Sequence, residues 1–129
     1  MGLNRMKGAV SRHMRAFAAE LTHGLGIPKA CAGVIEVLAL TGRRLSFGEI
    51  AARVAISERS LRSHIRIMVA RGILLRKVAV TRTRRLAYEY YLAPLGDVLG
   101  LVRRELAAKT QRLHRLTMEL RSAKRQQPA

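Results

Sequence analysis

The sequence predicts a mainly α-helical chain with one small β-hairpin. Nearly half of the 129 residues are apolar but only 4% are aromatic, which favours an aliphatic core of packed helices. Apolar residues recur at helical spacing towards both ends of the chain. Residues 73–80 and 86–92 are instead rich in β-branched and aromatic side chains, as strands are. We therefore expect one compact domain with helical extensions.

Residues 1–25 are predicted to form an amphipathic helix that packs on the core or on a dimer partner. Its apolar positions follow helical spacing: Leu3, Met6, Val10, Met14, Phe17 and Leu21. Gly24, Gly26 and Pro28 end this helix, and Pro28 also fits the first turn of a second, apolar helix. Gly42 stops the second helix, which we expect at the centre of the core.

Two further helices, joined by a tight turn, are predicted to follow. Ser46 and Glu49 form a capping-box pattern at the start of a helix over residues 47–54. The turn Ala55-Ile56-Ser57 leads into a longer helix, which Ser57 caps and Gly72 stops. This arrangement predicts a helix-turn-helix.

The helix after Ser57 is predicted to have two different faces. Its apolar side faces inward: Leu61, Ile65, Met68 and Val69. Its other side faces outward: Arg59, Ser60, Arg62, Ser63, Arg66 and Ile67. Arginine can pair with guanine, serine with phosphate and an apolar side chain with a thymine methyl group, so this face suits a DNA groove. An ordinary solvated face is the alternative, but no acidic residue there balances the three arginines.

The predicted β-hairpin has a basic tip. Four residues of this tip are candidates for a DNA-binding wing: Arg82, Thr83, Arg84 and Arg85. Neighbouring arginines repel one another unless phosphates or a narrow minor groove lie against them. Between Arg43 and Arg85 there are 12 basic and 2 acidic residues, so much of the net charge of +17 lies in this module. We expect Arg43 and Arg44 to contact the DNA backbone. We also expect Ser57, at the start of the helix that would read the DNA, to contact DNA together with the outward face of that helix.

The order helix, helix, tight turn, helix and hairpin over residues 26–94 is that of a winged helix-turn-helix. The stretch from Glu49 to Leu61 resembles the helix-turn-helix of MarR-like and TrmB-like regulators. Three further motifs are similar to that group: Gly26-Ile27-Pro28, Arg71-Gly72-Ile73-Leu74 and Tyr88-Glu89-Tyr90. Ala55 departs from the pattern, since these families usually have glycine in the turn. The resemblance implies a homodimer with recognition helices in successive major grooves and wings on the flanking backbone or minor groove.

Residues 95–129 are predicted to form a long coiled-coil dimerisation helix with a frayed tail. The seam positions alternate spacings of four and three residues: Leu95, Leu99, Val102, Leu106, Lys109, Leu113, Leu116 and Leu120. A single helix would leave these leucines exposed, so the seam must pack on the N-terminal helix or on a second copy. Lys109 either fixes the register of a pair or directs its charge past the seam.

The direction of helix pairing stays open, although the charges favour an antiparallel pair. An antiparallel pair centred between Ala107 and Ala108 sets Glu105 opposite the partner's Arg112, twice by symmetry. A parallel pair matches Glu105 with Thr110 instead.

The sequence indicates no enzyme, metal site, cofactor or membrane segment. Cys31 is the only cysteine, and Cys31 with His23 is a faint metal candidate that lacks a third ligand. No catalytic grouping and no phosphate-binding loop is found. The first residues lack the apolar stretch of a secretory signal, and no segment is apolar for long enough to span a bilayer. We expect a cytoplasmic, nucleoid-associated protein.

These observations favour a sequence-specific transcriptional regulator that binds double-stranded DNA as a homodimer. An architectural DNA-binding protein of low specificity is the alternative, because basic residues continue along the C-terminal helix. An RNA-binding protein is a third hypothesis, but single-stranded RNA readers need exposed aromatic residues and the chain has only two Phe and three Tyr. No polar cluster marks a pocket for a small-molecule effector, whose existence the sequence leaves open.

Overall fold

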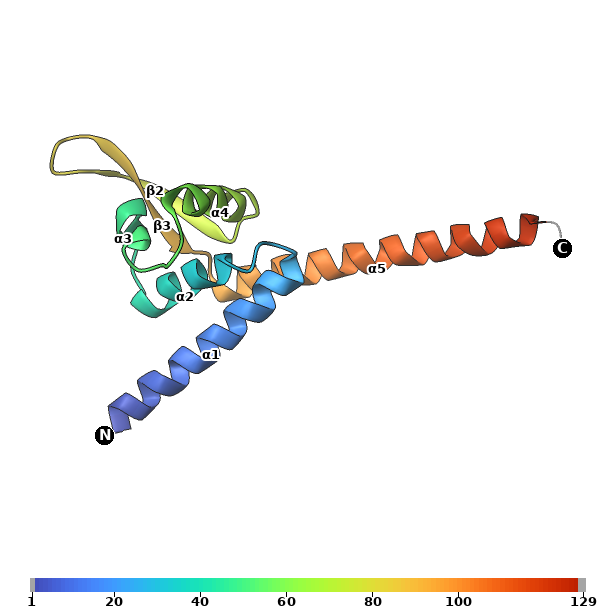
Figure 1. Cartoon of the computed structure of the whole chain (residues 1–129), viewed down its shortest axis with the longest axis horizontal. Helices are drawn as coiled ribbons and strands as arrows, with labels where there is room; N and C mark the ends of the chain where they lie inside the picture. Colours follow the sequence, from blue (N-terminus) through green and yellow to red (C-terminus); the bar gives the residue numbers. More distant parts are fainter. Residues whose placement is uncertain (1, 128–129) are drawn as a thin grey trace.

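The computed structural model describes residues 2–127, with side chains from residue 8 onward (Figure 1). Its elements are α1 (Gly2–Leu25), α2 (Cys31–Thr41), β1 (Leu45–Ser46), α3 (Phe47–Ala51), α4 (Glu58–Ala70), β2 (Leu74–Val80), β3 (Leu86–Leu92) and α5 (Leu95–Gln126). The mainly α-helical fold with a β-hairpin wing and a long C-terminal helix confirms the predicted fold class. The predicted apolar positions Leu3 and Met6, and residues 128–129 of the predicted tail, lie outside the described parts.

The core is aliphatic and lies between α2, α4 and the base of the sheet. Helix α2 is central, as predicted, because four of its residues are buried: Cys31, Val34, Ile35 and Leu38. Leu61 and Met68 of α4, Leu74 of β2 and Val98 of α5 have no exposed surface. Their side chains join several elements into one cluster, which fixes α4 against the sheet.

The sheet has three antiparallel strands in the order β1-β3-β2. In the hairpin, Leu74 lies opposite Leu92 and Val80 lies opposite Leu86. Strand β1 was not predicted, because its two residues are too few to show the alternation typical of a strand. The outer part of the hairpin extends beyond the body, so that Val80 and Leu86 are exposed (Figure 1).

The helix boundaries match the predictions, with two corrections. Pro28 lies in a turn before α2 rather than in its first turn, since the Cys31 N–H donates to the Pro28 carbonyl oxygen at 3.0 Å. Helix α3 ends at Ala51 rather than Val54. Beyond Ala51 the chain forms a tighter turn, in which the Arg53 N–H donates to the Ile50 carbonyl oxygen at 2.9 Å. The stop at Gly42 is confirmed, because this glycine has a φ of 66° that other residues rarely adopt.

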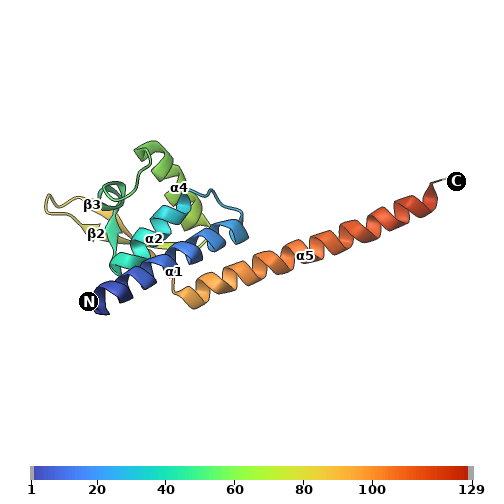
Figure 2. The same ribbon diagram turned by 60° about the horizontal axis from the view of Figure 1, so that its bottom comes forward.

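Helices α1 and α5 meet near the end of α1, and α5 then continues away from the body (Figures 1 and 2). The buried Val98 anchors the first turns of α5 to the core. A Cβ atom on Gly24 of α1 would lie 3.5 Å from Cγ1 of Val102, so the two helices are in close contact there. Within residues 2–127, no helix combines the length and the apolar character that a bilayer span requires.

Candidate nucleic-acid interface

Helix α4 is fixed in place by an N-terminal cap and a buried apolar stripe. The Ser57 hydroxyl oxygen accepts a hydrogen bond from the Ser60 N–H at 3.2 Å, as predicted for a cap. Glu58 lies in the first turn, where a negative charge favours the helix dipole. The predicted inward face is buried or half-buried in the core: Leu61, Ile65, Met68 and Val69. The opposite face is therefore left to solvent.

The outward face of α4 is exposed and basic. Its exposed side chains are Arg59, Ser60, Arg62, Ser63 and Arg66. In the described part of the chain the ion pairs involve other arginines, so this face carries charge that no carboxylate neutralises. Ile67 was predicted to face outward, but it is half-buried and packs against the core, because burying its apolar side chain is favourable.

A basic groove lies between α4 and the base of the hairpin. It has a volume of ≈ 450 Å³, and its lining includes Phe47, Arg62, Arg66, Arg76 and Tyr90. The Arg62 guanidinium lies 4.4 Å from the centre of the Phe47 ring, which orients it by a cation–π interaction. Arg76 lies at the same distance from the Tyr88 ring. Two arginines of this surface are thus held in position by aromatic rings.

Phe47 and Arg76 are not among the site residues that the sequence predicts. A signal for Arg76 exists, because it lies two positions after the buried Leu74 and therefore on the strand face that turns to α4. Phe47 gives no comparable signal, since its contact with Arg62 depends on how α3 and α4 pack.

The wing tip is a compact, exposed and basic turn. The Thr81 N–H donates to the Arg85 carbonyl oxygen at 2.9 Å, and the Arg85 N–H donates to the Thr81 hydroxyl oxygen at 3.1 Å. The hydroxyl groups of Thr81 and Thr83 are hydrogen-bonded at 3.0 Å. Arg84 has a φ of 58°, in the left-handed region that favours glycine. The tip therefore holds the exposed Arg82, Arg84 and Arg85 close together on an ordered turn.

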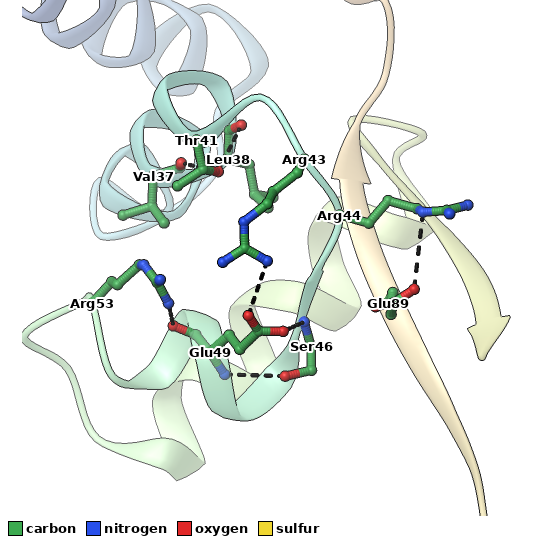
Figure 3. A network of polar contacts seen from close by, with 9 residues as sticks. All are labelled: Val37, Leu38, Thr41, Arg43, Arg44, Ser46, Glu49, Arg53 and Glu89. Atoms are coloured by element: carbon green, nitrogen blue, oxygen red, sulfur yellow. Dashed lines mark hydrogen bonds and ion pairs between the residues drawn. The ribbon is translucent and has the colours of Figure 1, made fainter. Parts of the chain in front are cut away.

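The two arginines predicted to contact the DNA backbone each lie beside a glutamate (Figure 3). Nη1 of Arg43 is 3.1 Å from Oε2 of Glu49, and Nε of Arg44 is 3.9 Å from Oε1 of Glu89. A hydrogen bond from the Ser46 N–H, and then the Arg43 guanidinium, hold the pKa of Glu49 below its ordinary value. Both arginines are therefore balanced by carboxylates, unlike the arginines of α4, and their contact with DNA stays a prediction.

The predicted dimerisation residues of α5 divide into two groups. Five leave much of their surface exposed: Leu99, Leu106, Leu113, Leu116 and Leu120. Val102 and Lys109 are half-buried against the same chain, close to Gly24 and Gly26 at the end of α1. The exposed group is available to a partner, whereas α1 occupies part of the predicted seam.

The faint metal candidate, Cys31 with His23, is not supported by the geometry. Cys31 is buried and burial raises the pKa of its thiol to about 11, while His23 is exposed. Among the described residues, no group of three or more histidine, cysteine, aspartate or glutamate side chains is placed to hold a metal ion.

The fold is shared with solved structures of transcription regulators. A possible transcriptional regulator from Methanosarcina mazei Go1 superimposes with a TM-score of 0.68 at 13% identity, over 76% of this chain and 82% of that one. A MarR family transcription regulator gives a TM-score of 0.51 at 17% identity, over 96% and 86% of the two chains. A MepR mutant from S. aureus bound to an oligodeoxyribonucleotide gives 0.52 at 18% identity, over 95% and 91%. Neither a protein-family model nor a curated protein matches this chain.

These likenesses confirm the predicted resemblance at the level of the fold. The chain has the winged-helix architecture of MarR-family structures, followed by a long C-terminal helix. At identities below 20% they do not carry over an operator or an effector.

Proposed function

We propose that this chain is a transcriptional regulator that binds double-stranded DNA as a homodimer. Helix α4 enters the major groove, and the hairpin tip lies on the flanking backbone or in the minor groove. The observation that carries the proposal is the exposed face of α4, where Arg59, Arg62 and Arg66 have no carboxylate partner in the described chain. Such a face is stabilised when phosphates or base edges approach it.

The basic residues of the wing and the groove also favour duplex DNA as the partner. Arg82, Arg84 and Arg85 extend the basic surface beyond the body, and Arg76 continues it along the base of the hairpin. A duplex presents two grooves and a continuous phosphate backbone, so it can engage a helix and a projecting turn together. The bound oligodeoxyribonucleotide in the MepR structure shows that a protein with this fold binds DNA.

The proposal includes a preference of the chain for particular DNA sequences. Arg62 is held by Phe47, and an arginine with a fixed guanidinium is suited to bidentate pairing with guanine. Selection of bound duplexes from a random pool at physiological salt tests this property. We expect an enriched pseudo-palindromic motif, and a pool that stays random after selection would contradict sequence-specific binding.

An architectural DNA-binding protein is the alternative, favoured by the charge of distal α5. Residues 110–127 contain five basic side chains, Arg112, Arg115, Arg121, Lys124 and Arg125, against the single Glu119. Backbone binding by such a protein falls steeply with salt and differs little between sequences. A ratio near one between affinities for selected and scrambled duplexes would favour this alternative, and stronger binding to RNA than to duplex DNA would contradict both.

A further inference from the structure

Helix α5 continues away from the body (Figures 1 and 2), and the end of α1 covers its apolar stripe only in part, beside Val102. Residues 110–127 are all exposed, including three leucines of the distal half: Leu113 (66%), Leu116 (50%) and Leu120 (58%). The proximal half exposes three more on the same seam: Leu95 (52%), Leu99 (47%) and Leu106 (51%). Leucines at heptad spacing are stabilised by packing on another helix.

We propose that the α5 helix of a second copy covers this stripe in the antiparallel direction, so that the distal half of each α5 packs on the proximal half of the other. The inference rests on the proposed function only in taking the chain to be a homodimer. With the two-fold axis between Ala107 and Ala108, the layers match apolar residues: Leu95 with the partner's Leu120, Leu99 with the partner's Leu116, and Val102 with the partner's Leu113.

A positive charge in the apolar seam would oppose this pairing, but the position of Lys109 takes its charge out of the seam. Its Nζ atom lies 4.0 Å from the place that a Cβ atom would occupy on Gly26, just beyond the C-terminal end of α1. A positive charge is favourable at that end of a helix. The ammonium group therefore leaves the seam, and only the aliphatic stem of Lys109 meets the partner's Leu106.

Charge complementarity favours the antiparallel direction. The antiparallel direction sets Glu105, which also lies 3.7 Å from Nη2 of Arg71 in its own chain, opposite the partner's Arg112, twice by symmetry. A parallel pair also gains ion pairs, between Glu119 and the partner's Lys124 and again twice by symmetry, but it places the two copies of Lys109 in one layer. The parallel direction thus sets two Lys109 stems against each other in a central layer, whereas the antiparallel direction gives each stem a leucine.

The apolar stripe also continues into a groove that only the antiparallel direction covers. The groove has a volume of ≈ 600 Å³ and lies at the start of α5, and its lining includes Met14, Leu38, Tyr91, Pro94 and Leu95. Leu95 belongs to both the groove and the seam, so the partner residues that follow Leu120 reach this place. Arg43 and Arg44 at the groove are balanced by glutamates, which reduces their repulsion of the basic helix end.

The antiparallel pair has a direct consequence for DNA binding. The residues at the start of the two α5 helices would lie 25 positions apart along the pair, which is about 38 Å at 1.5 Å per residue. Half-sites one DNA turn apart are separated by about 34–36 Å. A parallel pair would place both winged helices at the same end of the coiled coil.

Spin-label distances test the direction of pairing in the full-length chain. The native thiol is removed by Cys31→Ala, and a label is attached at Ser122→Cys near the end of α5. The antiparallel pair predicts a separation of about 45 Å between the two labels, and a parallel pair predicts less than about 20 Å. A short distance would overturn the proposal.

A second label, at Ala108→Cys near the two-fold axis, shows whether the helices pair at all. Both directions bring these labels within about 20 Å of each other. The absence of a short distance there would overturn pairing through α5, and it would leave the proposed DNA binding to be judged by duplex affinity of the same variants. A short distance at position 108 with a long one at position 122 supports the antiparallel pair.

A charge reversal gives an independent test with a matched control. Arg112→Glu sets a glutamate against the partner's Glu105 on each side of the two-fold axis of the antiparallel pair, whereas in a parallel pair position 112 meets Thr117. We expect the dimer dissociation constant to rise about tenfold for Arg112→Glu and little for Arg115→Glu, which lies on the outer face of the helix. Equal effects of the two variants, measured by sedimentation equilibrium, would overturn the register.

Discussion

Arg71 and Leu25 lie 46 residues apart and are joined by a hydrogen bond, in which Nη2 of Arg71 donates to the Leu25 carbonyl oxygen at 2.9 Å. The same nitrogen lies 3.7 Å from Oε2 of Glu105. One guanidinium thus links the end of α4 to the last carbonyl of α1 and to α5. Because helix C-terminal carbonyls lack partners within the helix, this contact stabilises the junction between α1, α4 and the long helix α5.

Arg71→Ala is therefore expected to destabilise the chain by about 1–2 kcal/mol, because it leaves the Leu25 carbonyl and Glu105 without their partner. Urea unfolding followed by circular dichroism measures the change. Arg115→Ala, which removes an exposed arginine from α5, serves as the control and should change the free energy of unfolding little. If both variants unfold at the same urea concentration, the Arg71 contacts do not stabilise the junction.

Arg62 and Arg66 are expected to determine sequence preference. The double change Arg62→Lys and Arg66→Lys keeps both charges but removes the guanidinium fork that reads guanine, and it weakens the stacking of residue 62 on Phe47. We expect the removal of each bidentate pair to reduce discrimination by about 1–3 kcal/mol, while affinity for scrambled duplexes changes less. Fluorescence anisotropy with selected and scrambled duplexes gives both numbers. Unchanged discrimination would show that these arginines do not read bases.

The wing tip is expected to contribute affinity without sequence preference. If the tip contacts phosphates, as the proposed function has it for the flanking backbone, Arg82→Ala with Arg85→Ala should weaken binding to all duplexes by similar factors. The slope of log affinity against log salt should fall in magnitude by about 0.9 for each phosphate that the variant no longer neutralises. A salt titration of the variant and the parent measures the slope, and an unchanged slope would place the tip away from DNA.

The sequence predicts most of the fold because its signals are local. The Ser46 cap, the Ser57 cap and the stop at Gly42 each depend on residues within one turn, and all three are confirmed. The missed features depend on packing between distant segments: β1 exists only by pairing with β3, and Ile67 is drawn inward by the core. The ion pair of Arg43 with Glu49 was not predicted for the same reason, because it forms only when the segment between α2 and α3 has folded.

Glu49 is expected to give the chain a stability that depends on pH. Its pKa lies below the ordinary value of 4.5 because of the Ser46 N–H and then Arg43, so the carboxylate stabilises the folded state at neutral pH. This contribution is present above the ordinary pKa and is lost as the pH falls through the folded value. Glu49→Gln keeps the capping geometry but does not titrate. Thermal unfolding should show the difference between parent and variant shrinking as the pH is lowered from 7 to about 3. A difference that stays constant would contradict this role.

Substitutions at Arg84 test the folding of the wing separately from its proposed binding to DNA. Its φ of 58° is strained for a residue with a Cβ atom, so Arg84→Gly is expected to stabilise the hairpin by about 1 kcal/mol relative to Arg84→Ala. Both variants lose the same charge from the exposed tip, so their affinities for duplex DNA should fall by similar factors. Hydrogen exchange of amides near the tip measures the local stability, and anisotropy measures the affinity. If only the alanine variant lost affinity, the order of the turn and not the charge of Arg84 would determine binding. Equal protection in the two variants would instead show that this turn stores no strain.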